Sequence, residues 1–343
     1  MNVCFIMYPW EAITPASDST LRMIHECASR GHRVGLTTAP NLTIRDSTTM
    51  AFCRMYDAAV KPSKSIETFY KQAKFKEQML PLAGFDVIFM RANPPLDATV
   101  LNFLDSVKDD VLIVNNVLGL REANNKLYTA AMNGPGAEIT PRTWVSKNKE
   151  YLQRVIRDNT SQKMIMKPLN GFGGSGVIVI EKNAIQNVNS LLDFYISGKG
   201  NESNYVIIQD YVEGADQGDV RVLMLHGEPI GAMRRVPAEG EARSNVHAGG
   251  KAVKHVLTAE EKRVCQLIGP KLIKDGLFFV GIDLIGGKLI EVNVLSPGGI
   301  VNINRLNKVK LQKRIVDWAE DMVRHQAWSQ ERRVALRRTV DEA

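Results

Sequence analysis

Residues 164–182, MIMKPLNGFGGSGVIVIEK, hold a glycine-rich loop between two β-like runs. Glycine-rich loops that bind phosphate usually open a helix, but the residues after this loop alternate and branch like a strand. Neither the P-loop pattern nor a dinucleotide-binding fingerprint is present. The stretch therefore predicts a hairpin-like lid between two strands, with Lys167 at its mouth and a small charged ligand beneath it.

A second hairpin is predicted at residues 281–294, GIDLIGGKLIEVNV, where two strands flank a Gly-Gly turn. A two-residue loop would place Asp283 and Glu291 on opposite faces, whereas a three-residue loop ending at Lys288 places them directly across from each other. In the second register Asn293 shares their face, because side chains two residues apart in a strand point the same way. Oxygen ligands of this kind suit Mg²⁺ or Mn²⁺. The alternative is a polar, solvated sheet face, which the Ile, Leu and Val neighbours disfavour.

Composition and charge restrict the class of protein. The chain has 343 residues, of which 44% are hydrophobic and 24% charged, as in a globular protein of two or three domains. A net charge of +7 indicates an anionic partner. Because no basic cluster lies beside aromatic residues, nucleotide phosphates and a carboxylate substrate are favoured over nucleic acid.

Cysteine use and hydropathy indicate a cytoplasmic protein. The four cysteines have no spacing typical of a metal site, so we expect reduced core thiols. No apolar run approaches the ~18 residues that a membrane-spanning helix needs, so no membrane partner is expected.

The chain up to residue 118 is predicted to be a doubly wound α/β domain. The run NVCFIM, the helix N-cap signal SDST, the periodic LRMIHECASR and the run RVGLTT form a β-α-β unit. Further buried strands are predicted at 85–91 and 110–116, which extends a parallel sheet.

Three further regions follow. Residues 119–205 are predicted to hold two helical stretches, one of them at 119–132, and the hairpin around the glycine-rich loop. Residues 206–325 are rich in strands, with a helix at 258–276 that begins at the cap Thr258, and a closing helix at 311–325. The mixed-charge tail, 326–343, is interpreted as a frayed or solvated helix, with a nucleic-acid-binding arm as the less favoured alternative.

Taken together, the motifs resemble a known superfamily. NNKLYTA, MKPLNGFGGSGV, IQDYVEGADQGDVRVL, RSNVHAGG and GIDLIGGKLIEVNVLSP occur in the order and spacing of ATP-grasp enzymes. Over roughly residues 1–325 the chain is similar to bacterial glutathione synthetases. The resemblance implies an N-terminal α/β domain followed by an ATP-grasp fold, in which two α+β subdomains sandwich ATP.

The resemblance also implies an activity. It is that of an ATP-dependent carboxylate–amine ligase, which forms glutathione from γ-glutamylcysteine and glycine through an acylphosphate. The implied cofactors are ATP and two Mg²⁺ or Mn²⁺ ions. The implied partners are small peptide and amino-acid substrates and further copies of the chain in a dimer or tetramer.

Site residues follow from the same resemblance. The ATP-binding set has four parts. Two lysines hold the phosphates, the glycine-rich loop covers them, a hinge binds the adenine, and an acid lies on the ribose side. In that order the residues are Lys126 and Lys167; Gly171, Gly173, Gly174, Ser175 and Gly176; Gln209, Asp210, Tyr211 and Val212; and Asp219. The metal ligands are Asp283, Glu291 and Asn293. The groups assigned to stabilise the acylphosphate and the oxyanion are Arg221 and Arg243. The substrate-binding set is Asp18, Arg235, Asn245, Ser296, Pro297, Gly298 and Gly299.

The chain departs from the bacterial glutathione synthetase pattern at its predicted substrate end. Ala92 and Asn93 stand where a Lys-Asp pair is usual, and the sequence after Pro297 differs. His247 in RSNVHAGG is more typical of the ribosomal-protein-glutamate ligase branch, although a structural imidazole is the simpler interpretation. Two alternatives therefore stay open: a ligase that adds an amino acid to another peptide or a protein end, and a nucleotide-binding regulatory module without turnover.

Overall fold

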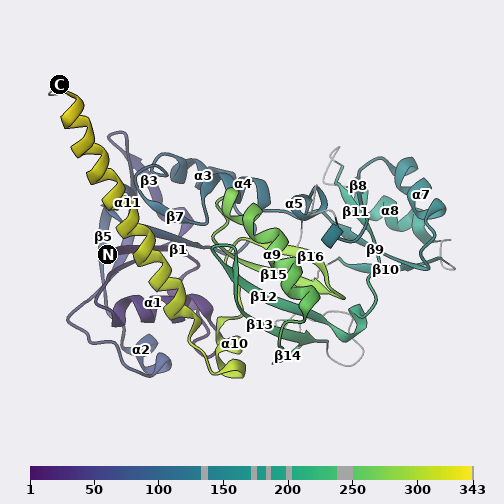
Figure 1. Ribbon diagram of the computed structural model, residues 1–343, viewed down its shortest axis with the longest axis horizontal. Coiled ribbons are helices and arrows are strands. Elements are labelled where there is room, and N and C mark those ends of the chain that lie inside the picture. Colours follow the sequence, from purple (N-terminus) through teal and green to yellow (C-terminus); the bar gives the residue numbers. More distant parts are fainter. Residues whose placement is uncertain (133–137, 171–175, 183–186, 198–202, 238–249, 342–343) are drawn as a thin grey trace. The chain divides into compact units, whose positions relative to one another are not determined.

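The computed structural model describes residues 1–132, 138–170, 176–182, 187–197, 203–237 and 250–341 (Figure 1). The chain divides into two compact units. Unit 1 comprises Met1–Arg121, Gly276–Phe278 and Gly298–Ala343, and unit 2 comprises Glu122–Asp275 and Phe279–Pro297.

Unit 1 is built on a seven-stranded sheet of order β3-β4-β2-β1-β6-β7, with β5 paired to β4. The strands are β1 (Asn2–Met7), β2 (Arg33–Thr37), β3 (Leu42–Arg45), β4 (Thr48–Tyr56), β5 (Phe75–Pro81), β6 (Val87–Arg91) and β7 (Leu112–Val114). β1 pairs in parallel with β2 and β6, and β6 with β7, which confirms the predicted α/β sheet. β3, β4 and β5 form an antiparallel extension that was not predicted from the sequence.

Unit 1 also contains helices. They are α1 (Ser19–Ser29), α2 (Ile66–Gln72), α3 (Ala98–Asp105), most of α4 (Val117–Ala123), α10 (Ile300–Asn307) and α11 (Leu311–Asp341), with short 3₁₀ turns η1 (Trp10–Ala12), η2 (Ala39–Asn41) and η3 (Leu82–Gly84). α11 packs against α1 through its first turns, where Ile315, Val316 and Ala319 are buried. The helix then continues to Asp341, so the tail is a regular extension of the predicted closing helix (Figure 1).

The first sheet of unit 2 has the antiparallel order β10-β9-β11-β8. Its strands are β8 (Thr143–Ser146), β9 (Lys163–Pro168), β10 (Ile178–Glu181) and β11 (Val206–Asp210), and its helices are α7 (Lys149–Asp158) and α8 (Val188–Ile196). Met166 and Ile208 pack with Leu152 of α7 and Leu192 of α8 in one apolar core. The two strands predicted around the glycine-rich loop are therefore confirmed as β9 and β10.

The second sheet of unit 2 has the order β14-β13-β12-β15-β16. Its strands are β12 (Asp219–Leu225), β13 (Glu228–Val236), β14 (Lys251–Lys254), β15 (Phe279–Ile285) and β16 (Lys288–Asn293), with η5 (Ala215–Gln217) before β12. α9 (Ala259–Lys274) begins, as predicted, at Thr258. A capping box fixes that start: the Glu261 backbone N donates to Thr258 Oγ1 at 3.2 Å, and the Thr258 backbone N donates to Glu261 Oε2 at 2.8 Å.

The prediction of a single helix at 119–132 was wrong. The structure has two short helices there, α4 and α5 (Leu127–Ala130). Asn125 Oδ1 accepts a hydrogen bond from the Leu127 backbone N at 2.9 Å, and this local bond competes with helix continuation. Within the described part of the chain, no helix is both long enough and apolar enough to cross a membrane.

Candidate active site

The β15–β16 hairpin places the predicted metal ligands on one face, but with a different turn from the predicted one. The turn is a two-residue one, with φ of +52° at Gly286 and +72° at Gly287. Asp283 nevertheless lies opposite Glu291, because Ile290 is an extra residue that forms a β-bulge. The predicted three-residue loop was wrong, whereas the predicted pairing of the two acids is confirmed.

Asp283 is almost fully buried, with 5% of its surface exposed. Arg221 donates from Nε to Oδ1 at 2.5 Å and from a terminal nitrogen to Oδ2 at 2.9 Å, and Arg235 lies 3.0 Å from Oδ2. Asn293 Nδ2 donates to Oδ2 at 3.1 Å. Burial alone would raise the pKa of Asp283, but the two guanidinium groups outweigh it and hold the pKa at about 2. Asp283 is therefore a carboxylate at neutral pH.

Arg235 joins Asp283 to a second buried acid. Its Nε donates to both oxygens of Asp219, at 3.1 and 3.0 Å. The strand register explains these contacts, because Asp219 lies across from Arg235 on β12 and β13, and Arg221 lies across from Asp283 on β12 and β15. The structure thus brings the predicted ribose-side acid, metal ligand and two arginines into one network, in which Arg235 contacts protein carboxylates.

The two predicted phosphate-binding lysines belong to the same unit as this hairpin. Lys126 Nζ lies 3.2 Å from a carboxylate oxygen of Glu291, whose side chain is 30% exposed. Lys167 is only 6% exposed, and its Nζ donates to Gln209 Oε1 at 3.0 Å. Burial lowers the pKa of Lys167 to about 8; the Glu291 carboxylate opposes this shift and Lys126 adds to it. The structure therefore places Lys126, Lys167 and Glu291 within electrostatic reach of one another.

The predicted adenine hinge lies at the end of β11. Gln209 and Asp210 are its last residues, and Tyr211 and Val212 follow in the connecting loop. The Asp210 carboxylate accepts hydrogen bonds from Arg142 Nε at 2.7 Å and from Asn159 Nδ2 at 2.9 Å. The Asp210 side chain therefore ties this segment to its neighbours.

The predicted substrate-binding residues fall in both units. In unit 1 the two carboxylate oxygens of Asp18 accept hydrogen bonds from the Leu21 backbone N and the Tyr8 hydroxyl, so Asp18 caps α1. The Gly299 backbone N donates to Ser19 Oγ at 3.3 Å. Gly298 lies beside it in unit 1, whereas Ser296 and Pro297 end unit 2.

Several predicted residues lie outside the described part of the chain. They are Gly171, Gly173, Gly174, Ser175, Arg243, Asn245 and His247. Gly176 is described: its φ is +70°, and its carbonyl accepts a hydrogen bond from the Tyr195 hydroxyl at 2.8 Å.

The donor set of the hairpin fits a hard divalent cation. Among the residues that the structure describes, no group of three or more His, Cys, Asp or Glu side chains is arranged to hold a metal ion. Asp283, Glu291 and Asn293 instead offer two carboxylates and one amide on facing strands. An all-oxygen set of this kind suits Mg²⁺ or Mn²⁺. Glu291 is the more accessible of the two acids.

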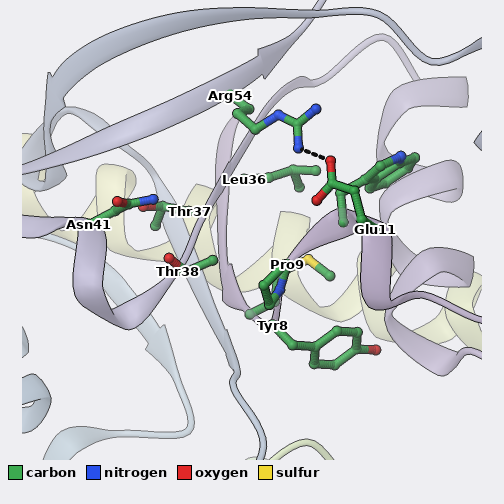
Figure 2. Close-up of a pocket in the computed structure, with 10 residues that line it drawn as sticks. Tyr8, Pro9, Glu11, Leu36, Thr37, Thr38, Asn41 and Arg54 are labelled. Carbon is green, nitrogen blue, oxygen red and sulfur yellow. Dashed lines mark hydrogen bonds and ion pairs between the residues drawn. The ribbon is translucent and has the colours of Figure 1, made fainter.

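Unit 1 also contains a cavity of about 240 Å³ at the carboxyl ends of β1 and β2 (Figure 2). Glu11 and Arg54, 2.7 Å apart, close one side of it, and Thr38 and Asn41 lie on another. None of the predicted site residues lines this cavity.

Comparison with known proteins gives the family. The model of the prokaryotic glutathione synthetase N-terminal domain matches residues 1–121, and that of the prokaryotic glutathione synthetase ATP-grasp domain matches 125–308. The chain belongs to the prokaryotic glutathione synthetase family. The glutathione synthetase of Gloeobacter violaceus is 33% identical over 333 residues, covering 94% of this chain and 98% of that protein. That of a Synechocystis species is 34% identical over 331 residues, covering 93% and 99%.

Solved structures support the fold. D-cycloserine synthetase DcsG superposes with a TM-score of 0.60 at 14% identity, covering 92% of this chain and 100% of that one. The ATP-grasp ligase PsnB, solved with its minimal precursor, Mg and ADP, gives 0.58 at 14% identity, covering 94% and 98%. The predicted family and the ATP-grasp fold are confirmed. Members of this family are ligases that form a carbon–nitrogen bond, as the resemblance implied.

Gln209, a predicted ATP-binding residue, has a side-chain partner that was not predicted from the sequence. Thr143 of β8 accepts a hydrogen bond on Oγ1 from Gln209 Nε2 at 2.8 Å. The two residues are 66 positions apart and meet only because β8 pairs with β11. No local pattern could have indicated this contact.

Proposed function

We propose that the chain is a glutathione synthetase, which joins γ-glutamylcysteine to glycine with conversion of ATP to ADP and phosphate. The observation that carries the proposal is the identity of 33–34% to glutathione synthetases over 93–94% of the chain. The cluster of two lysines and a glutamate in unit 2 supports it, because phosphoryl transfer needs cations around the phosphates.

In the proposed reaction the cysteinyl carboxylate attacks the γ-phosphorus of ATP and releases ADP. The amine of glycine then attacks the acylphosphate, and phosphate leaves as the amide forms. Neither step requires a nucleophile from the protein, whose contribution is positioning and charge stabilisation. Lys126 and Lys167 are assigned to hold the phosphates, together with the backbone of the glycine-rich loop.

The metal site is assigned to Asp283, Glu291 and Asn293. We propose two Mg²⁺ or Mn²⁺ ions, which when bound neutralise charge on the phosphate oxygens. Arg221 is assigned to the transferred phosphoryl group, and its two hydrogen bonds to Asp283 hold it beside this proposed metal ligand. Arg235 is better suited to holding Asp219 and Asp283 in place than to binding a substrate carboxylate, because it is buried between those two acids.

We also propose that the enzyme works as a homo-oligomer in the cytoplasm. Its four cysteines are free and buried, which suits a reducing compartment. Light scattering during gel filtration would test the assembly, since a monomer at micromolar concentration would contradict it.

The activity is tested by ADP release from ATP–Mg²⁺ with γ-glutamylcysteine and a panel of amines, with products identified by mass spectrometry. We expect glutathione with glycine as the best acceptor. ADP release with another acid–amine pair only would retain the ligase assignment and reject glutathione. If no pair releases ADP from folded protein that binds ATP, the regulatory-module alternative becomes the better one.

A further inference from the structure

The β8–β11 sheet presents a polar stripe on the face opposite its apolar core. Met166 and Ile208 point to the core that contains helices α7 and α8. Because neighbouring side chains in a strand alternate, Lys167 and Gln209 point the other way. Thr143 lies directly across from Gln209 in the β8–β11 register, so it shares that face. All three residues lie on the side of the sheet that the proposed function assigns to ATP.

Hydrogen bonds connect the three side chains, each donating to the next from Lys167 to Gln209 to Thr143. Lys167 Nζ donates to Gln209 Oε1 at 3.0 Å, and Gln209 Nε2 donates to Thr143 Oγ1 at 2.8 Å. The Thr143 hydroxyl in turn donates to the Pro141 carbonyl at 2.8 Å. Because the Thr143 hydroxyl has a single hydrogen and the Lys167 ammonium can only donate, this is the direction in which all three contacts are hydrogen bonds. The Thr143 hydroxyl donates its hydrogen to Pro141 and accepts from the amide nitrogen, and it thereby helps to keep the oxygen of the Gln209 amide facing the lysine.

We propose that Thr143 is a positioning residue of the nucleotide site, which acts through Gln209 to hold the Lys167 ammonium in place for the phosphates of ATP. This inference rests on the proposed function, in which Lys167 contacts phosphate. Gln209, assigned above to the adenine hinge, gains a second role through its side chain.

The chemistry of the chain suits this task. A lysine on a flexible stem that is buried needs an acceptor to keep its ammonium in one position. Lys126 lies beside the Glu291 carboxylate, whereas the acceptor at Lys167 is a neutral amide oxygen, which fixes the ammonium without adding a negative charge next to it. The amide can do so only while it is oriented, and Thr143 supplies the orientation.

The test compares Thr143→Val with Thr143→Ser. Valine keeps the shape of threonine but removes the hydroxyl, so the Gln209 amide is no longer held; serine keeps the hydroxyl. We expect Kd for ATP–Mg²⁺, measured by calorimetry, to rise about tenfold in Thr143→Val and to stay within about twofold of wild type in Thr143→Ser. Both variants should retain the wild-type melting transition.

A double-mutant cycle separates positioning from a merely structural effect. In a Gln209→Ala background the link between Thr143 and Lys167 is already broken, so adding Thr143→Val should change the Kd by less than about twofold. The proposal is overturned if Thr143→Val binds ATP like the wild type, or if it weakens binding equally in both backgrounds. Lys167→Met serves as the control for the proposed function. If it binds ATP as tightly as the wild type, the phosphate role of Lys167 is rejected, and the positioning role with it.

Discussion

The lowered pKa of Lys167 predicts a specific pH dependence of ATP binding. With a pKa of about 8 in the free protein, the charged fraction of Lys167 falls from about nine tenths at pH 7 to about one tenth at pH 9. If the phosphates of ATP bind the charged form, the apparent affinity should fall about tenfold over this interval, or about 1.4 kcal/mol. Binding above pH 8 should accordingly take up a proton.

The direction of this pH dependence follows from the linkage between ATP binding and protonation of Lys167. ATP phosphates favour the ammonium, so they raise the pKa of Lys167 in the complex, and affinity is lost as pH rises through the value of the free protein. The terminal phosphate of ATP is already ionised in this range and adds little to the slope. Lys167→Arg is the matched control, because a guanidinium stays charged to above pH 12 and should give a flat profile.

Calorimetry at pH 7, 8 and 9, at constant free Mg²⁺ and in buffers of different ionisation enthalpy, measures both the affinity and the proton uptake. A flat wild-type profile would refute the reasoning. An equal slope in Lys167→Arg would assign the titration to a different group.

Three further predictions concern the hairpin and the fold. Glu291→Gln should lower kcat by at least ~10²-fold with the melting temperature unchanged, whereas the exposed control Glu260→Gln should retain full activity. Near-normal turnover of Glu291→Gln at saturating Mg²⁺ would remove the metal assignment. Gly281→Ala should lower kcat about tenfold in steady-state kinetics, because an added Cβ would lie 3.2 Å from Arg221 Cδ and displace that side chain. An unchanged kcat would show that Arg221 does not need this position. Thr258→Ala should cost about 1 kcal/mol in urea unfolding through loss of the capping box, with unchanged kcat; equal stability would mean that solvent replaces the cap.

The hairpin shows what a sequence can and cannot predict about a site. The Gly-Gly turn and the flanking apolar residues predict the two strands, and the requirement for a shared face predicts that Asp283 lies opposite Glu291. The β-bulge at Ile290 has no signal of its own, because isoleucine is an ordinary strand residue. The predicted pairing of Asp283 with Glu291 was therefore correct, although the turn from which it was predicted was wrong.

Elsewhere, prediction from the sequence failed for strands with exposed side chains and for contacts that depend on long-range strand pairing. The parallel strands of unit 1 are continuous apolar runs and were predictable. β5, by contrast, reads FKEQMLP and has mostly exposed or half-buried side chains, so it lacks the alternation of a strand. The contacts of Arg235 with Asp219 and Asp283 depend on pairing between β12, β13 and β15, and only the fold brings these residues together.

The central claim is amide formation through an acylphosphate, and isotope transfer tests it most directly. γ-Glutamylcysteine labelled with ¹⁸O in both oxygens of its cysteinyl carboxylate is incubated with the enzyme, ATP–Mg²⁺ and glycine. We predict that each turnover delivers one ¹⁸O atom to the released phosphate and leaves one in the amide carbonyl of glutathione. Formation of glutathione together with unlabelled phosphate would contradict the account. Release of ADP without any amide product would contradict it as well.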